Sequence, residues 1–164
     1  MVRNCCKDTT NLQFYNLLST IYLNNWSFNR NFASSSISIN MKAISTTKAP
    51  GAIGPYSQAI QAGDFVYTSG QLGLDPATGA FPEGGIKEQT RQSLTNVKAI
   101  LEAAGLSMAN VVKTSVFMAD MNDFAEMNSV YAEFFSEPYP ARSAVAVKTL
   151  PKNALVEIEV VATK

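Results

Sequence analysis

Two segments of the sequence have the spacing of an amphipathic helix, and they lie among six segments with strand character. Residues 86–104 place apolar side chains at intervals of three and four before a glycine: Leu94, Val97, Leu101, Ala104 and Gly105. Residues 122–135 repeat this spacing with Phe124, Met127, Tyr131 and Phe134. Two helices can cover one face of so wide a sheet, but not both. The pattern therefore predicts an α+β layer whose second face meets water or another copy of the chain, which favours an oligomer.

The strand segments alternate or are rich in β-branched and aromatic residues, and turn chemistry separates them. They are "KAIS" (42–45), "SQAIQA" (57–62), "FVYTSG" (65–70), "VVKTSVFMAD" (111–120), "YPARSAVAV" (139–147) and "LVEIEV" (155–160). With the helices included, the order is β-β-β-α-β-α-β-β. This order predicts one mixed six-stranded sheet with both helices on a single face.

Residues 1–40 differ in composition from residues 41–164. They are rich in Asn and Ser, contain one acidic residue, and have polar residues within every apolar run, which argues against a transmembrane helix. Two interpretations stay open. The segment is a targeting peptide for mitochondria or another organelle, or it is an unstructured leader on a cytoplasmic protein. We therefore predict an extension over 1–40 and one folded domain over 41–164, with no membrane segment.

Histidine is absent from the chain, and Cys5 and Cys6 are neighbours within the extension. Their absence from the domain excludes Ser-His and Cys-His nucleophile pairs and a His-ligated metal site, so we predict neither a metal nor a cofactor. Residues 1–40 hold three of the 13 basic and one of the 13 acidic side chains, which leaves the domain slightly acidic. A domain without a basic field is a poor match for nucleic acid. The chemistry has to rely on carboxylates, Arg, Tyr, Ser, amides and water.

The last two strands carry charges within apolar runs. Side chains alternate along a strand, so Arg142 and Ala144 share one face, and Glu157 and Glu159 share one face of the following strand. The short "LPKNA" (150–154) connection predicts an antiparallel hairpin. Pairing its apolar faces would bring the Arg142 face and the Glu157 face to the same side of the sheet. That side is either an ordinary solvated face or a covered one, where the charges need partners or a ligand.

The chain contains "GPYSQAI", "VYTSGQLGLDPATG", "TRQSLTNVKAILEAAG", "KTSVFMADMNDFAEMNSVY" and "PARSAVAVKTLPKNALVEIEVVA". Together these stretches resemble the reactive-intermediate deaminase family, also called the Rid or YjgF-type family. The resemblance runs from about Met41 to Lys164. It implies a chorismate-mutase-like fold and a homotrimer packed sheet against sheet, with three small-molecule clefts at the subunit interfaces.

The resemblance also implies roles for individual residues. Arg142 would bind the carboxylate of a substrate, and Glu157 would position and activate the attacking water. The remaining substrate-binding positions of the family match Tyr56, Ser69, Gly70, Asn128 and Ala144. Many members carry Cys at the last of these positions, where the contact is attributed to the backbone, so alanine should be tolerated.

The reaction that the resemblance implies is hydrolysis of 2-imino acids, and of their 2-aminoacrylate tautomers, to 2-keto acids and ammonia. Such imines arise from dehydration of threonine and serine. An imine carbon is already electrophilic, so the attacking water needs a positioned base but no metal or covalent nucleophile. Two alternatives remain: an endoribonuclease or translation inhibitor, and a trimeric small-molecule-binding protein without catalysis. The presence of both Arg142 and Glu157 favours the enzyme.

Overall fold

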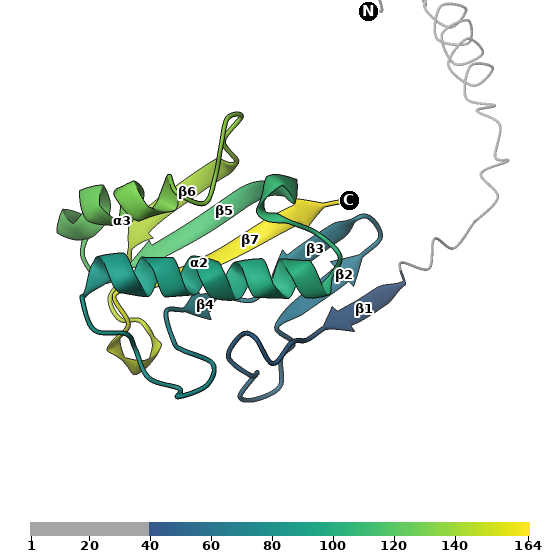
Figure 1. The fold of residues 1–164 in the computed structure, drawn as a ribbon, viewed down its shortest axis with the longest axis horizontal. Coiled ribbons are helices and arrows are strands. Elements are labelled where there is room, and N and C mark those ends of the chain that lie inside the picture. The colour runs from purple at the N-terminus through teal and green to yellow at the C-terminus, as the bar shows by residue number, and fades with distance from the viewer. Residues whose placement is uncertain (1–39) are drawn as a thin grey trace, which may run out of the picture. The chain divides into compact units, whose positions relative to one another are not determined.

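The structure, a computed structural model, describes residues 40–164. Figure 1 labels its strands and helices: β1 (Met41–Ile44), β2 (Ala59–Ala62), β3 (Phe65–Thr68), β4 (Gln71–Leu72), α2 (Ile86–Ala103), β5 (Val111–Met118), α3 (Phe124–Tyr131), β6 (Ala141–Ala146) and β7 (Val156–Thr163). Short 3-10 turns occupy Met108–Asn110, Met121–Asp123 and Pro151–Asn153. The predictions for the extension, whether targeting peptide or leader, lie outside the described residues.

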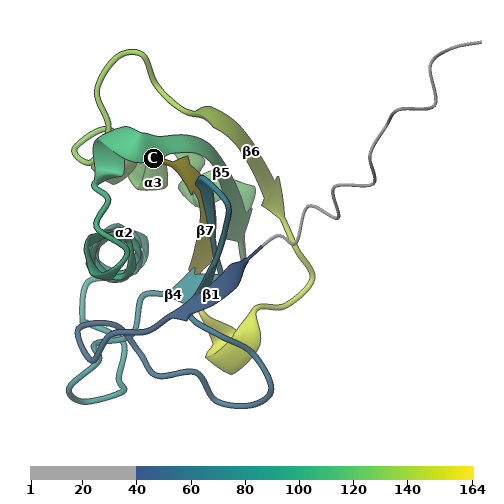
Figure 2. The same cartoon turned by 90° about the vertical axis from the view of Figure 1, so that its right-hand side faces the viewer.

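All seven strands belong to one sheet. Its order is β1-β2-β3-β7-β5-β6, and β4 pairs with β7 beyond the end of β3. Both α2 and α3 lie on one side of the sheet, and no α-helix of residues 40–164 covers the other side (Figures 1 and 2). The prediction of an α+β layer with a mixed sheet and two helices on one face is confirmed. The sheet has one strand more than predicted, because β4 is too short to show a period.

The core lies between the helices and the sheet. Leu94, Val97 and Leu101 on α2 are fully buried, as the helical spacing predicts. The side chains of β7 alternate between buried and half-buried, which is the pattern of a central strand with one covered face.

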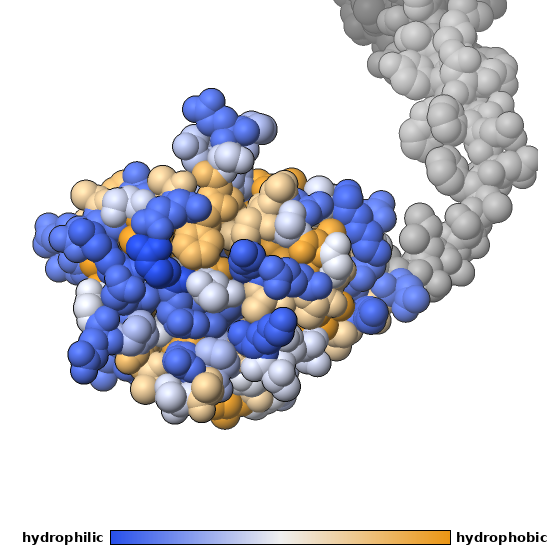
Figure 3. All heavy atoms as spheres, in the orientation of Figure 1, coloured by the Kyte–Doolittle hydropathy of each residue, from blue (hydrophilic) through white to orange (hydrophobic). Residues whose placement is uncertain are grey.

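Hydrophilic side chains are spread across the outer surface that carries α2, with smaller apolar patches between them (Figure 3). Gly105 follows the helix with φ of 78°, the left-handed conformation that glycine adopts without strain.

The predicted hairpin of the last two strands is wrong. β6 pairs with β5 in parallel, and β7 pairs with β5 in antiparallel orientation, so β5 lies between them. The parallel pairing is possible because α3 provides the crossover from β5 to β6. The connection over residues 147–155 is long enough to pass one intervening strand, since neighbouring strands lie about 4.8 Å apart and a residue spans about 3.3 Å.

The predicted alignment of the two charged faces is also wrong. Thr114 of β5 stands opposite both Arg142 and Val160, so Arg142 points to the side of the helices. Phe117 of β5 stands opposite Glu157, on the side without helices. Within one subunit, Arg142 and Glu157 therefore lie on opposite faces of the sheet. The prediction depended on direct pairing of β6 with β7, and the intervening strand removes that condition.

The sheet face without helices exposes large apolar side chains. Phe65, Tyr67 and Val145 are 45%, 48% and 48% exposed. Exposed apolar residues gathered on one sheet face are typical of a surface that packs against another molecule. The homotrimer stays a prediction at this point, since the structure holds one copy of the chain. Within residues 40–164, no helix is both long and apolar enough to cross a membrane.

Candidate active site

One cavity of about 540 Å³ brings together four of the predicted site residues, and we call it the Glu157 pocket. Tyr56, Ser69, Gly70 and Glu157 all line it. They come from three parts of the chain: the segment before β2, the junction of β3 with β4, and β7. Residues that are distant in the sequence therefore meet at the point where β3 gives way to β4.

A β-bulge explains why this junction faces the pocket. Tyr67 stands opposite Val161 and Gln71 opposite Ile158, so four steps along β3 and β4 match three steps along β7. One residue is extra, which takes the junction out of the regular ladder. The hydroxyl of Thr68 accepts a hydrogen bond from the backbone N–H of Val160 at 2.9 Å, replacing the ladder bond that the bulge removes. Bulges of this kind commonly direct side chains at active sites.

Gly70 is needed because the carboxylate of Glu157 occupies the space beside it. A Cβ atom at position 70 would lie 1.9 Å from Oε1 and 2.7 Å from Cδ of Glu157. No side chain can be accommodated there while Glu157 keeps its place. The backbone of Gly70 thus forms one wall against the carboxylate.

The hydroxyl of Ser69 is held by the chain itself. It donates a hydrogen bond to the backbone carbonyl of Ser57 at 2.7 Å, and the backbone N–H of Ser69 donates to the carbonyl of Gln58 at 2.9 Å. Because its proton is already engaged, the hydroxyl presents its lone pairs to the pocket and can act there as an acceptor.

Buried polar side chains of α2 support this part of the site. Ser93 Oγ donates to the carbonyl of Gln71 at 2.8 Å, and Asn96 Nδ2 donates to the carbonyls of Leu72 and Leu74 at 3.0 and 2.9 Å. The Gln89 side chain accepts from the N–H of Leu155, two residues before Glu157. These bonds tie α2 to the backbone of β4, to Leu74 just beyond it and to the segment that leads into β7. The sequence analysis missed these residues, although their spacing of four and three along the helix was the available signal.

The pKa of the Glu157 carboxyl lies above its usual range. Burial is the larger cause, because it disfavours the charged form, and the nearby Glu159 carboxylate adds repulsion. A carboxylate with a raised pKa is a stronger base when it is ionised, which suits the abstraction of a proton from water.

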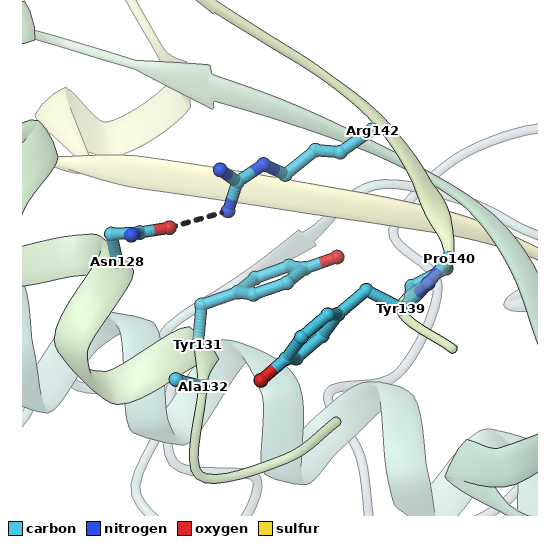
Figure 4. A pocket seen from close by; sticks show the side chains of 6 residues that line it. All are labelled: Asn128, Tyr131, Ala132, Tyr139, Pro140 and Arg142. Atoms are coloured by element: carbon cyan, nitrogen blue, oxygen red, sulfur yellow. Dashed lines mark hydrogen bonds between the residues drawn. The ribbon is translucent and has the colours of Figure 1, made fainter. Parts of the chain in front are cut away.

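A second cavity of about 430 Å³ holds the other predicted charge, and we call it the Arg142 pocket. Figure 4 shows the guanidinium of Arg142 extending from β6 towards α3, where its Nη1 donates to Oδ1 of Asn128 at 2.7 Å. The guanidinium carbon lies 4.6 Å from the centre of the Tyr131 ring, within cation–π range. Among the described residues, Asn128 is the one hydrogen-bond partner of this guanidinium, so its other N–H groups are available to a ligand.

Three residues that the sequence analysis did not name as site residues also line these pockets. Tyr131 and Tyr139 form walls of the Arg142 pocket (Figure 4). Burial raises the pKa of Tyr131, whose hydroxyl shares a hydrogen bond with Thr114 at 2.9 Å. Lys152 lines the Glu157 pocket with a left-handed backbone, φ 56°, which is a strained conformation for a non-glycine residue. The helical spacing marked Tyr131 as an apolar stripe residue and not as a site residue, and no spacing marks Tyr139 or Lys152.

The predicted site residues thus divide into two groups in one subunit. Tyr56, Ser69 and Gly70 accompany Glu157, whereas Asn128 accompanies Arg142. Ala144 lies on the same face of β6 as Arg142, opposite Val116, and lines neither of these pockets. Within residues 40–164, no group of three or more acidic, His or Cys side chains is arranged to hold a metal ion.

Known proteins match this chain over nearly the whole described region. The Endoribonuclease L-PSP family matches residues 46–164. The chain belongs to this family. It is the Rid, or YjgF-type, family that the sequence motifs resemble, and that prediction is confirmed.

Relatives of this Rid-family chain have different names. A RutC family protein of Pyrococcus horikoshii is 58% identical over 123 residues, which cover 75% of this chain and 98% of the relative. The human 2-iminobutanoate/2-iminopropanoate deaminase is 50% identical over 125 residues, or 76% and 91% of the two chains. Escherichia coli TdcF, solved with bound serine, is 50% identical to this chain in sequence. Its structure matches with a TM-score of 0.71 and covers 75% of this chain and 98% of TdcF. The chorismate-mutase-like fold is thereby confirmed.

Proposed function

We propose that this protein is a hydrolytic deaminase that converts 2-imino acids, and their 2-aminoacrylate tautomers, to 2-keto acids and ammonia. The mammalian relatives named 2-iminobutanoate/2-iminopropanoate deaminase, at about 50% identity, support this proposal. The observation that carries it is the pair of groups in the two pockets: a carboxylate with a raised pKa at Glu157, and a guanidinium with available donors at Arg142.

Because these two groups lie on opposite faces of one subunit, a complete site takes Arg142 from one copy and Glu157 from another. The exposed apolar residues on the sheet face without helices favour packing of sheet against sheet. We therefore include in the proposal a homotrimer, with the clefts at the subunit interfaces, and a small-molecule substrate.

In the proposed reaction, Arg142 binds the substrate carboxylate with two parallel N–H donors, and Asn128 holds the guanidinium from the side. Glu157 accepts a proton from water, whose oxygen bonds to the carbon of the protonated imine while the π electrons of the C=N bond move to nitrogen, which becomes a neutral amine. The lone pairs of Ser69 accept a hydrogen bond from the water or from the substrate nitrogen. Glu157 then gives its proton to this amine, the C–N bond breaks as the hydroxyl oxygen forms the carbonyl, and ammonia leaves. Glu157 accepts the hydroxyl proton and passes it to ammonia, which restores the carboxylate.

Imine turnover tests the proposal directly. A threonine dehydratase would generate 2-iminobutanoate, and release of 2-ketobutanoate would be followed with and without the protein. We expect acceleration by the wild-type protein, and none by Arg142→Ala or Glu157→Gln variants whose thermal unfolding and oligomeric state match the wild type. Absence of acceleration by the wild-type protein would refute the deaminase.

Mixing the two inactive variants tests whether the site is shared between copies. Each shared site needs an intact Arg142 from one copy and an intact Glu157 from its neighbour. Random co-assembly of the Arg142→Ala and Glu157→Gln chains should restore about one quarter of the wild-type activity, because each residue is intact in half of the copies. A mixture that stays inactive, although mass spectrometry detects mixed assemblies, would refute the shared site.

The second candidate function is RNA cleavage, favoured by the description of the matching family as an endoribonuclease. The slightly acidic domain argues against it, since contacts with phosphates require a cationic track. The same variants discriminate between the candidates: RNA cleavage that persists in Arg142→Ala and Glu157→Gln would come from another surface or from a contaminant.

A non-catalytic binder would bind serine without accelerating imine hydrolysis.

A further inference from the structure

Residues 46–56 contain no regular secondary structure, and Pro50, Gly51, Ile53 and Tyr56 among them form one wall of the Glu157 pocket. Gly51 and Tyr56 of this segment also line another cavity, of about 580 Å³. Because these residues border two cavities, packing gives the wall little support. Residues 51–56 are all exposed in the subunit, and the one hydrogen bond recorded within them is the short contact from the N–H of Tyr56 to the carbonyl of Gly54. Another interaction has to hold the wall in place.

The side chain of Gln58 provides that interaction. Its Oε1 accepts from the N–H of Thr46 at 2.6 Å, and its Nε2 lies within hydrogen-bond distance of three carbonyls, those of Thr46 at 3.0 Å, Ala49 at 3.3 Å and Pro50 at 2.8 Å. Gln58 is 3% exposed, so water does not compete for these bonds. One side-chain amide thus uses both of its polar ends on the backbone at the beginning of the wall.

The backbone of the same residue reaches the opposite side of the pocket. The carbonyl of Gln58 accepts from the N–H of Ser69 at 2.9 Å, and the carbonyl of its neighbour Ser57 accepts from the Ser69 hydroxyl at 2.7 Å. Ser69 adjoins Gly70, whose backbone lies against the carboxylate of Glu157. Gln58 therefore joins the wall that carries Tyr56 to the bulge that lies against the proposed base.

We propose that Gln58 is a positioning residue, which acts by holding Tyr56 in register with Glu157 and Ser69. This inference rests on the deaminase function proposed above. Without the side-chain amide, the N–H of Thr46 and the carbonyls of Ala49 and Pro50 lose their partner, and the wall moves out towards solvent. Tyr56 moves with it, while the bulge and Glu157 stay in place, because buried side chains of α2 hold them independently.

Replacement of Gln58 by methionine tests the proposal, since methionine has a similar length and no amide. Gln61, three residues later on β2, is the matched control, because its side chain makes one exposed hydrogen bond, to the carbonyl of Gly63. We expect kcat/KM for imine hydrolysis to fall about tenfold or more in Gln58→Met, since displacement of a positioned group by 1 Å can cost about a hundredfold. Gln61→Met should stay within about twofold of the wild type, as expected of a surface change.

A double-mutant cycle separates positioning from a general structural role. If Gln58 acts through Tyr56, then Gln58→Met should lower kcat/KM less than about twofold in a Tyr56→Ala background, because the effects of coupled residues are not additive. An equal loss in both backgrounds would overturn the proposal. So would a loss of activity that simply follows the fraction of unfolded protein in thermal melts.

Proteolysis of the wall provides a readout that does not depend on catalysis. Lys48 is exposed and lies between the backbone groups that Gln58 holds. We expect trypsin to release the fragment that begins at Ala49 faster from Gln58→Met than from the wild type or Gln61→Met. Equal rates would overturn the role of Gln58 even if all variants were active. Faster cleavage from a protein that does not hydrolyse imines would support the role of Gln58 and refute the proposed function alone.

Discussion

Replacement of Gly70 by alanine should inactivate the protein and leave its fold intact. The new methyl carbon would lie 2.7 Å from Cδ of Glu157 and 1.9 Å from Oε1. Non-bonded carbon atoms pack at about 3.5–4.0 Å, so the carboxylate has to move by about 1 Å. A misplacement of this size at a reacting group can cost about a hundredfold, and we expect kcat/KM to fall by about that factor.

The effect on stability should be small by comparison. The clash involves the end of a flexible side chain, which can rotate away at a cost of about 0.5–1.5 kcal/mol. Gly73 provides a contrast three residues later, because a methyl group there would lie 2.4 Å from the backbone carbonyl oxygen of Gln89 on α2. Gly73→Ala should therefore lower the thermal midpoint strongly, whereas Gly70→Ala should lower it little.

The assay is 2-ketobutanoate release at several substrate concentrations, alongside thermal melts of each variant. The control introduces Gly70→Ala into a Glu157→Ala background. The clash is absent there, so Gly70→Ala should have no further effect on the residual rate. An activity of Gly70→Ala within about threefold of the wild type would refute the argument that the carboxylate must stay in place. An equal fold-loss of kcat/KM from Gly70→Ala in both backgrounds would also refute this argument.

Three further outcomes follow from the site. Because Glu157 must be ionised to accept a proton and its pKa is raised, activity should decline as the pH falls through a value above the ordinary range of a glutamate; Glu159→Gln removes the repulsion and should move this decline to lower pH in pH–rate profiles. Arg142→Lys loses the fork geometry and the stacking on the tyrosine ring, so KM should rise about tenfold in steady-state kinetics, and an unchanged KM would contradict the carboxylate contact. Asn96→Ala removes the hydrogen bonds to the carbonyls of Leu72 and Leu74 and should lower the free energy of unfolding by about 2–4 kcal/mol in urea titrations; a change below about 1 kcal/mol would contradict this support.

The α2 stripe and the alternation of β7 were predictable because helical and strand periods appear directly in the order of apolar residues. The motifs also named six residues that line the two pockets: Tyr56, Ser69, Gly70, Glu157, Asn128 and Arg142. The bulge at Ser69 and Gly70 was not predictable, because it depends on how many residues of β3 and β4 lie opposite a fixed length of β7. The polar row on α2 was visible in its spacing, but its role depended on which backbone carbonyls of β4 lie beside it.

The sequence by itself determined both helices, the longer strands of residues 40–164 and the fold class. Alternation within a strand states which residues share a face, such as Arg142 with Ala144, but it does not state which strand lies next or which face meets the helices. The tertiary structure decided both, by placing β5 between β6 and β7. That placement puts Arg142 and Glu157 on opposite faces of one sheet, because each side chain follows the register of its pairing with β5.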